Sequence, residues 1–375
     1  MSLFDVYPLF DITPVKGEDV YVYDDKGNKY LDLYGGHAVI SIGHSHPSYV
    51  KNISNQVSKL GFYSNSIQNP LQTKLANKLT ELSGCTDYKL FLCNSGAEAN
   101  ENAIKLASFH TNKKKLIAFT NSFHGRTSAA VAATDNTKIV APVNAQQEVE
   151  FFDLGDITGV EKSLKKGDVC AVIVEFVQGV GGLGESDAHF YEKLDELCKE
   201  NGACLIADEV QSGFGRTGDF FAFQKYNIEP EIISIAKGMG NGFPVGGILI
   251  HPAIKASYGL LGTTFGGNHL ACIASLTVLE TIEKESLMEN VFEIYYYFLQ
   301  QSSSIQKHAK VKGRGLMLGL EFDFPVKELR SNLIYKHHIF TGSSKNPNLL
   351  RILPPLTLKK EHIDDLFDAI KSELS

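Results

Sequence analysis

The amino-acid sequence predicts an α/β protein with a large, mainly parallel sheet and a smaller α+β part. The middle of the chain contains short, nearly continuous apolar segments, which are typical of strands covered on both faces. An amphipathic helix is predicted between two of them, and the order strand, helix, strand favours right-handed crossover connections. The apolar segments span residues 115–120, 170–177, 203–207, 232–236 and 245–250.

The predicted helix spans residues 188–201. Asp187 precedes it as a candidate N-cap, and Gly202 follows it as a candidate C-cap. Apolar side chains recur along the segment at helical spacing, namely at Phe190, Tyr191, Leu194, Leu197 and Cys198.

The two ends of the chain show different patterns. Residues 18–33 alternate around an Asp-Asp-Lys-Gly-Asn turn and predict a hairpin. Residues 311–322 predict strands broken by glycines, and the last helix carries an apolar face at Ile363, Leu366, Phe367 and Ile370.

These patterns predict a division into two domains. We expect residues 48–285 to form the large domain, with residues 1–47 and 286–375 forming the small one. A length of 375 residues suits such an arrangement.

Composition excludes several classes of protein. A formal net charge of -7 argues against a nucleic-acid binder, and no apolar segment reaches the roughly 20 residues that a membrane span needs. The N-terminus lacks a charged-then-apolar signal pattern. The six cysteines form no C-x-x-C pair, so we expect reduced core thiols in a cytoplasmic protein.

The first candidate for chemistry begins at Asn94, after an apolar strand at residues 90–93. Ser95 and Glu98 have the spacing of a capping box at the start of a helix. The small residues Gly96 and Ala97 leave backbone N–H groups open to an anion, and the helix dipole favours negative charge there. The segment therefore predicts either a phosphate cradle or simply a well-capped helix.

The second and third candidates follow other apolar strands. Asp208 ends one strand, where ligands of α/β sheets bind, and its carboxylate could pair with a protonated ring nitrogen of a cofactor. Lys237 follows another strand and precedes a glycine-rich loop; partial desolvation would favour its free amine for Schiff-base chemistry. The alternatives are a solvated loop carboxylate and an ordinary surface lysine.

Further candidates carry hydroxyl and guanidinium groups. Thr263 and Thr264 lie in a glycine-rich turn and could bind phosphate or cap the turn. Arg126 follows Phe123 closely, and Arg351 precedes an apolar segment. Arginine forks suit carboxylate substrates, although either arginine could form a structural ion pair.

No metal site is predicted. The histidine pairs are not accompanied by Cys, Asp or Glu at ligand spacing, so we expect turn or packing roles for His44, His46, His337 and His338. The absence of a G-x-S-x-G motif also disfavours a hydrolase of the α/β type.

Taken together and in this order, five segments resemble the class III, or ornithine-type, aminotransferases, whose fold is that of the type I pyridoxal-phosphate enzymes. The resemblance extends from Tyr30 to Arg351. The segments that carry it are NSGAEANENAIKLA (94–107), SFHGRT (122–127), ADEVQSGFGRTG (207–218), AKGMGNGFPVGG (236–247) and TFGGN (264–268).

The resemblance implies pyridoxal 5'-phosphate as cofactor, Lys237 as its Schiff-base lysine and Asp208 as the partner of its ring nitrogen. It implies that substrate carboxylates meet Arg126 and Arg351, that Glu175 modulates a substrate arginine, and that Thr263 contacts substrate. The implied cofactor-binding residues are Gly96, Ala97, Phe123, Asp208, Val210, Gln211, Lys237 and Thr264.

Within the family, the chain is most similar to the acetylornithine branch. That implies a homodimer that transfers the δ-amino group of an N-acylornithine to 2-oxoglutarate, yielding glutamate, in arginine biosynthesis. The chain departs from the usual pattern at residues 175–182, where Phe176 replaces a proline and Val180 a glutamate. This departure leaves the acyl group open, and succinylornithine remains a candidate beside acetylornithine.

Four alternatives remain open at this stage. Ornithine δ-aminotransferase and 4-aminobutyrate aminotransferase would share the cofactor residues. A class III racemase or mutase would turn over a single substrate without an oxo acid. A non-enzymatic binding protein could keep the fold, but the retained lysine and aspartate argue against it.

Overall fold

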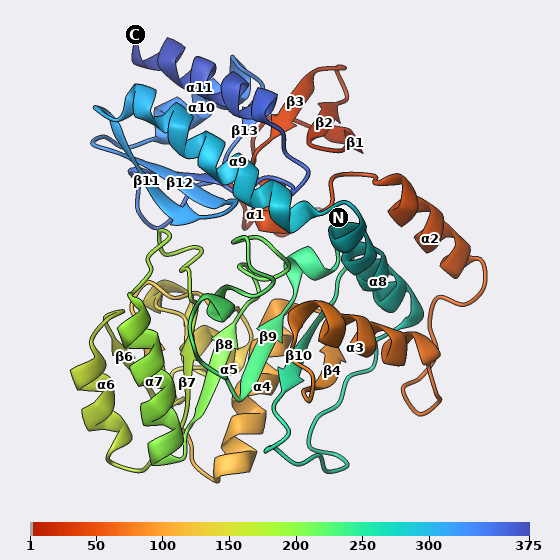
Figure 1. Ribbon diagram of the computed structural model, residues 1–375, viewed down its shortest axis with the longest axis vertical. Coiled ribbons are helices and arrows are strands. Elements are labelled where there is room, and N and C mark those ends of the chain that lie inside the picture. Colours follow the sequence, from red (N-terminus) through yellow and green to blue (C-terminus); the bar gives the residue numbers. More distant parts are fainter. Residues whose placement is uncertain (1–2) are drawn as a thin grey trace.

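A computed structural model describes residues 3–375, and its largest sheet has seven strands in the order β4-β10-β9-β8-β7-β5-β6 (Figure 1). The strands are β4 (Lys89–Cys93), β5 (Lys115–Phe119), β6 (Val149–Phe152), β7 (Val169–Val174), β8 (Cys204–Asp208), β9 (Ile232–Ile235) and β10 (Gly246–Ile250). The five strands predicted in the middle of the chain are therefore confirmed, with ends displaced by at most three residues.

Most of this sheet is parallel, as predicted, but β10 is not. It pairs antiparallel with β9 on one side and with β4 on the other. The connection from β9 to β10 contains only residues 236–245. A parallel crossover needs a dozen or more residues, usually with a helix, so this shorter connection reverses the chain direction.

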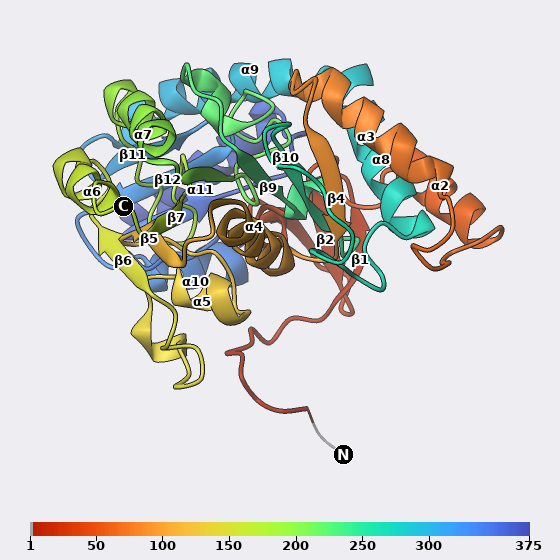
Figure 2. The ribbon, with the colours of Figure 1, turned by 90° about the horizontal axis from the view of Figure 1, so that it is seen from below.

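Helices cover both faces of the large sheet. Figure 2 shows α4 (Gly96–Thr111) on one side of it and α7 (Ala188–Asn201) on the other. The predicted bounds and caps of α7 are confirmed. Asp187 accepts a hydrogen bond from the backbone N–H of Phe190 at 2.8 Å, and Gly202 adopts the left-handed conformation with φ of 60°. The predicted apolar face of α7 is buried.

The two ends of the chain meet in a four-stranded sheet of order β1-β2-β3-β13. The predicted hairpin is present in β2 (Tyr21–Asp24) and β3 (Lys29–Asp32), and β1 (Pro14–Glu18) extends it. On the other side, β13 (Ile339–Phe340) pairs parallel with β3.

A three-stranded sheet of order β11-β12-β14 completes the upper part of the molecule in Figure 1. It contains β11 (Ala309–Arg314), β12 (Met317–Phe322) and β14 (Leu349–Ile352), so the strands expected within residues 311–322 are confirmed. The bounds of the two domains stay a prediction.

The remaining helices pack around these sheets. They are α1 (Gly35–Ala38), α2 (Pro47–Val57), α3 (Pro70–Ser83), α5 (Ser128–Ala132), α6 (Ile157–Leu164), α8 (His269–Lys284), α9 (Leu287–Ser302), α10 (Lys327–Tyr335) and α11 (Lys360–Leu374). The apolar face predicted for the last helix is buried in α11. No helix within residues 3–375 has the length and apolar character needed to cross a membrane.

The cysteines are free thiols, as expected. Cys85 is half-buried and the other five are buried. Burial in apolar surroundings raises the pKa of Cys170 to about 11, so these groups remain protonated and behave as small apolar side chains.

Candidate active site

The candidate site lies at the edge of the large sheet where its parallel strands end. Asp208 closes β8, and Lys237 comes two residues after β9. Because β10 runs antiparallel to β9, its N-terminal end lies at this same edge. The residues that precede β10, including Val245, therefore also line the site. Ligands of α/β sheets usually bind at such an edge.

A cavity of about 340 Å³ opens at this edge. It brings together residues from four of the segments that the sequence singled out. The predicted site residues that line it are Gly96, Ala97, Phe123, Arg126, Asp208, Val210 and Lys237.

The start of α4 forms one wall of the cavity. Ser95 is the N-cap, and its hydroxyl accepts a hydrogen bond from the backbone N–H of Glu98 at 3.1 Å. The reciprocal half of the predicted capping box is wrong, because the Glu98 carboxylate accepts from the backbone N–H of Asn94 at 3.1 Å instead of turning back to Ser95. The N–H groups of Gly96 and Ala97 have no acceptor within the helix and are available to an anion.

Gly96 is required by close packing against the opposite wall. A Cβ atom at this position would lie 2.5 Å from Cγ1 of Val210. The glycine therefore allows the helix start to approach the segment after β8, which narrows the cavity between them.

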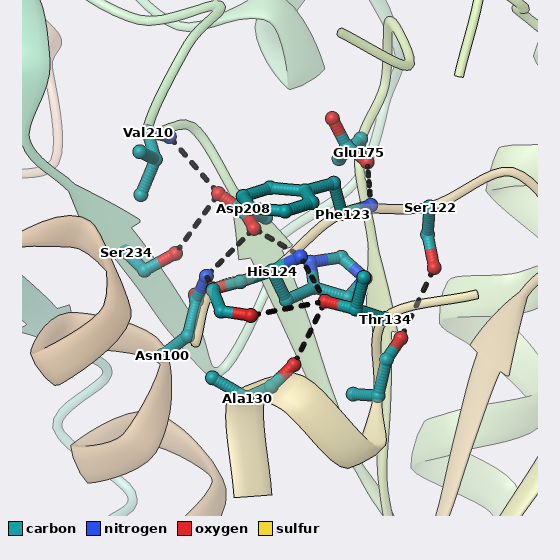
Figure 3. A network of polar contacts seen from close by, with 12 residues as sticks. Asn100, Ser122, Phe123, His124, Ala130, Thr134, Glu175, Asp208, Val210 and Ser234 are labelled. Carbon is teal, nitrogen blue, oxygen red and sulfur yellow. Dashed lines mark hydrogen bonds and ion pairs between the residues drawn. The ribbon is translucent and has the colours of Figure 1, made fainter. Parts of the chain in front are cut away.

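The Asp208 carboxylate is buried and surrounded by hydrogen-bond donors (Figure 3). Oδ2 lies 2.6 Å from Nδ1 of His124 and accepts from the Asn100 side-chain amide at 2.8 Å. Oδ1 accepts from the backbone N–H of Val210 at 3.1 Å. A carboxylate held this way keeps its position and its hydrogen-bonding capacity toward a group in the cavity.

Sequence reasoning did not single out Asn100 and His124. Both lie inside motifs that carried the resemblance, and both are almost fully buried polar residues. The Asn100 amide also donates to the backbone carbonyl of His124 at 2.8 Å, so it ties α4 to the loop after β5. The one available signal was a polar residue on the otherwise apolar face of α4, which needs a buried partner.

Lys237 has a constrained backbone and a perturbed amine. Its φ of 44° lies in the left-handed region, which is unusual for a residue with a side chain. Burial lowers the pKa of Lys237, and the Arg351 charge adds to this effect, whereas Asp208 and Glu175 oppose it. The free amine is therefore more accessible than in an ordinary lysine.

Glu175 and Arg351 both form hydrogen bonds with the backbone of Gly179. The Glu175 carboxylate accepts from the N–H groups of Phe123 and Gly179, each at 2.8 Å, and Nη1 of Arg351 donates to the Gly179 carbonyl at 2.9 Å. Burial raises the pKa of Glu175 and lowers the pKa of Arg351. The residues do not form a direct ion pair within the described chain, and neither lines the 340 Å³ cavity.

The two arginines differ in exposure. Arg126 lines the cavity and is exposed to solvent, whereas only 2% of Arg351 is exposed. Nε of Arg351 donates to the carbonyl of Ser343 at 2.6 Å, so a backbone carbonyl holds one side of its fork.

Besides Glu175 and Arg351, three more predicted site residues lie outside the cavity lining. Gln211 is buried and donates to the backbone carbonyl of His37 at 3.3 Å. Thr263 accepts from the backbone N–H of Gly266 at 3.1 Å, as expected for a turn cap, and Thr264 is exposed on the same loop.

The histidine pairs make polar contacts that do not require a metal. His44 lies 2.8 Å from Asp32, His46 lies 3.0 Å from Glu285, and His337 lies 2.9 Å from Glu373. Residues 3–375 contain no group of three or more His, Cys, Asp or Glu side chains suited to a metal ion.

Comparison with known proteins identifies the family. The sequence profile described as aminotransferase class-III matches residues 5–374. The chain belongs to the class III aminotransferases. It is an enzyme of the transaminase type, as its motifs predicted, and the predicted fold class is confirmed by solved structures of the same family.

Relatives of this class III aminotransferase match over nearly the whole chain. The acetylornithine aminotransferase of Aquifex aeolicus is 40% identical, over 99% of this chain and 99% of its own length. The solved acetylornithine aminotransferase of Elizabethkingia anophelis is 30% identical, with a TM-score of 0.84 over 98% of this chain and 94% of that one.

A second solved structure carries information about a cofactor. The ornithine aminotransferase of Toxoplasma gondii is 25% identical, with a TM-score of 0.88 over 97% of this chain and 90% of that one. In that structure, PLP partly occupies the active site.

Proposed function

We propose that this class III aminotransferase binds pyridoxal 5'-phosphate in the cavity between α4 and β8. The arrangement of side chains fits that group. The N–H groups of Gly96 and Ala97 offer an anion site for the phosphate, and Val210 and Phe123 supply apolar walls for the ring. Asp208 supplies a buried carboxylate for a protonated ring nitrogen, and Lys237 supplies the amine.

When bound, the cofactor acts as an electron sink that stabilises negative charge on the substrate carbon. The residues of the chain hold and move the protons that the reaction requires. Asp208, held in place by His124 and Asn100, keeps a proton on the ring nitrogen. The lowered pKa of Lys237 favours the free amine, which can take up a proton and return it.

We propose an N-acylornithine as amino donor and 2-oxoglutarate as acceptor, the reaction of the acetylornithine aminotransferases, with a role in arginine biosynthesis. The observation that carries this proposal is the 40% identity to such an enzyme over 99% of both chains. Arg126 and Arg351 support it, since a guanidinium fork suits each substrate carboxylate.

A substrate panel tests the proposal. Acetylornithine, succinylornithine, ornithine and 4-aminobutyrate are compared by kcat/KM with 2-oxoglutarate as acceptor. An N-acylornithine should be preferred over free ornithine, because its acyl group offers additional contacts in the transition state. Equal or better use of ornithine would instead indicate an ornithine δ-aminotransferase, and turnover without an oxo acid would indicate a racemase or mutase.

A further inference from the structure

A single left-handed helical turn, α1, lies where the upper and lower parts of the molecule meet (Figure 1). Gly35, Gly36, His37 and Ala38 all have positive φ, with values of 53°, 54°, 70° and 62°. The backbone N–H of Val39 closes the turn on the carbonyl of Gly35 at 2.8 Å. Left-handed turns are disfavoured for L-residues, so the two residues with a Cβ in this turn are strained.

The surrounding structure holds this turn in place from two sides. The Gln211 amide, next to the cavity wall, donates to the His37 carbonyl at 3.3 Å. The backbone N–H of Leu353, two residues after Arg351, donates to the carbonyl of Leu33 at 2.8 Å. The turn is therefore fixed both to the segment after β8 and to the segment that carries Arg351.

The turn brings two polar rings together beside Arg351. Residues three apart on a helical turn share a face, and the Tyr34 and His37 ring centroids are 4.6 Å apart. The Tyr34 hydroxyl is in hydrogen-bond contact with Nδ1 of His37. The Arg351 guanidinium lies 6.0 Å from the centroid of the Tyr34 ring. Tyr34 packs so closely on Gly342 that a Cβ there would overlap its ring, which fixes the ring position.

The Arg351 guanidinium can donate a further hydrogen bond next to Tyr34. Its Nε and Nη1 donate to the carbonyls of Ser343 and Gly179. Among the described residues, Nη2 donates to no backbone carbonyl, and the Arg351 guanidinium interacts with the Tyr34 hydroxyl. A guanidinium nitrogen without a backbone acceptor, next to a fixed hydroxyl, offers two donors to one carboxylate.

The protonation states of His37 and Tyr34 favour hydrogen-bond donation to a carboxylate next to Arg351. Partial burial lowers the pKa of His37, and the positive charges of Arg351, Lys237 and Arg330 lower it further, which favours the neutral imidazole. Burial raises the pKa of Tyr34, so its hydroxyl keeps its proton. A neutral imidazole with its proton on Nδ1 can donate to the Tyr34 oxygen and leave the phenolic proton free to donate elsewhere.

We propose that Tyr34 and His37 are specificity-determining residues that hold, together with Arg351, one carboxylate of the dicarboxylate acceptor 2-oxoglutarate. The Tyr34 hydroxyl donates a hydrogen bond to the carboxylate that Nη2 of Arg351 binds. The His37 imidazole orients this hydroxyl by donating a hydrogen bond to the phenolic oxygen. The inference rests on the proposed function for the identity of the acceptor. Acetylornithine has a single carboxylate, which we assign to Arg126, so the half-reaction with this amino donor does not use the pair.

The test measures the two half-reactions separately in the holoenzyme. Tyr34→Phe should raise the KM for 2-oxoglutarate by about 10-fold, the loss expected for one hydrogen bond to a charged group, with little change in kcat. The rate of the half-reaction with acetylornithine as amino donor should be unchanged. The dissociation constant of glutarate, a dicarboxylate that cannot react, should rise by a similar factor.

His37 is tested with a matched pair of substitutions. His37→Leu removes the donor and should raise the KM for 2-oxoglutarate as Tyr34→Phe does. His37→Asn retains an N–H donor and tolerates the left-handed backbone, so it should recover most of the affinity lost in His37→Leu. Tyr30→Phe is the control, since the Tyr30 hydroxyl is buried against Asp24 on the neighbouring strand.

Each outcome separates this inference from the proposed function. An unchanged KM for 2-oxoglutarate and unchanged glutarate binding in Tyr34→Phe and His37→Leu would overturn the inference, even if the wild type used acylornithine. Equal losses in both half-reactions, or equal effects of His37→Leu and His37→Asn, would also overturn it, because they indicate a structural role. If the wild type used another amino donor but Tyr34→Phe still weakened 2-oxoglutarate, the inference would stand and the donor assignment would fall.

Discussion

At the scale of single residues, Asp208 and Lys237 occupy neighbouring ends of adjacent strands and face one cavity. The sequence placed each of them after an apolar strand, and the resemblance to the class III aminotransferases gave them their expected roles. It did not indicate Asn100 and His124, which hold the Asp208 carboxylate. Their partners lie 108 and 84 residues away in the chain, and only the folded topology brings such residues together.

The role of Asp208 can be separated from its contribution to folding. Asp208→Asn keeps the size and burial of the side chain but removes the charge that we assign to the cofactor ring. We expect turnover to fall by roughly 10²–10³-fold, the range seen when one electrostatic partner of a reaction is removed. Steady-state kinetics at saturating cofactor measure this.

Asp195→Asn is the matched control for Asp208→Asn. Asp195 is similarly buried, at 6% exposed against 4%, and pairs with Lys199 at 2.7 Å on α7. Asp195→Asn should therefore keep turnover close to the wild-type value. Near-normal turnover in Asp208→Asn would show that the carboxylate is not needed for chemistry.

The perturbed amine of Lys237 predicts a pH-dependent stability of the cofactor-free protein. Its folded-state pKa is lowered by burial, so its contribution to stability is fully present above the ordinary value near 10.5 and is lost as pH falls through the lowered value. Methionine has no ionisable group, so the Lys237→Met variant does not lose this stability as pH falls. We therefore expect the variant to be more stable than wild type at pH 7, with the advantage shrinking toward pH 10.

Urea denaturation of the two cofactor-free proteins at several pH values measures the difference. An advantage of Lys237→Met that stays constant from pH 7 to pH 10 would mean that the lysine is not perturbed in the folded state.

At the scale of elements, the sequence predicted strands and helices well where apolar periodicity was long and caps were clear, as in α7. The direction of β10 was not predictable from its residues, because an apolar strand buried on both faces has the same composition in either direction. The length of the connection after β9 was the available signal. The capping box at α4 was half right, since Asn94 competes for the Glu98 carboxylate.

The close approach of α4 to the segment after β8 predicts a pair of compensating substitutions. Gly96→Ala places a methyl group against Val210 and should push the helix start away from its present position. We expect the dissociation constant of pyridoxal 5'-phosphate to rise by about 10-fold or more, since a phosphate site depends on the position of its N–H donors.

Val210→Ala removes the two methyl groups that the new Cβ would meet. The double variant Gly96→Ala, Val210→Ala should therefore bind the cofactor more tightly than Gly96→Ala alone. Cofactor titration followed by absorbance measures all of these variants. A double variant as weak as the sum of the two single losses would refute the packing argument.

At the scale of the whole molecule, the chain ends could be assigned to one region from their patterns, and the pairing of β13 with β3 confirms that they meet. We propose a homodimer in which the loop carrying Thr263 and Thr264 completes the phosphate site of the partner. Thr264 is exposed and lies outside its own subunit's cavity, which supports this arrangement.

Mixed dimers test the assignment of Thr264. Lys237→Ala and Thr264→Ala subunits are combined under exchange conditions. If Thr264 acts on the partner, each mixed dimer has one intact site, and activity should exceed that of either parent. No such gain, or an active enzyme that is strictly monomeric, would contradict a shared site.

The most direct measurement of the central claim is the location of the cofactor on the chain. Purified holoenzyme should be yellow, and borohydride reduction should leave pyridoxal phosphate covalently fixed to one peptide. We predict that peptide mapping finds the label on Lys237, the half-buried lysine that lines the cavity together with Asp208. A label on any other lysine, or a reduced protein that carries none, would contradict it.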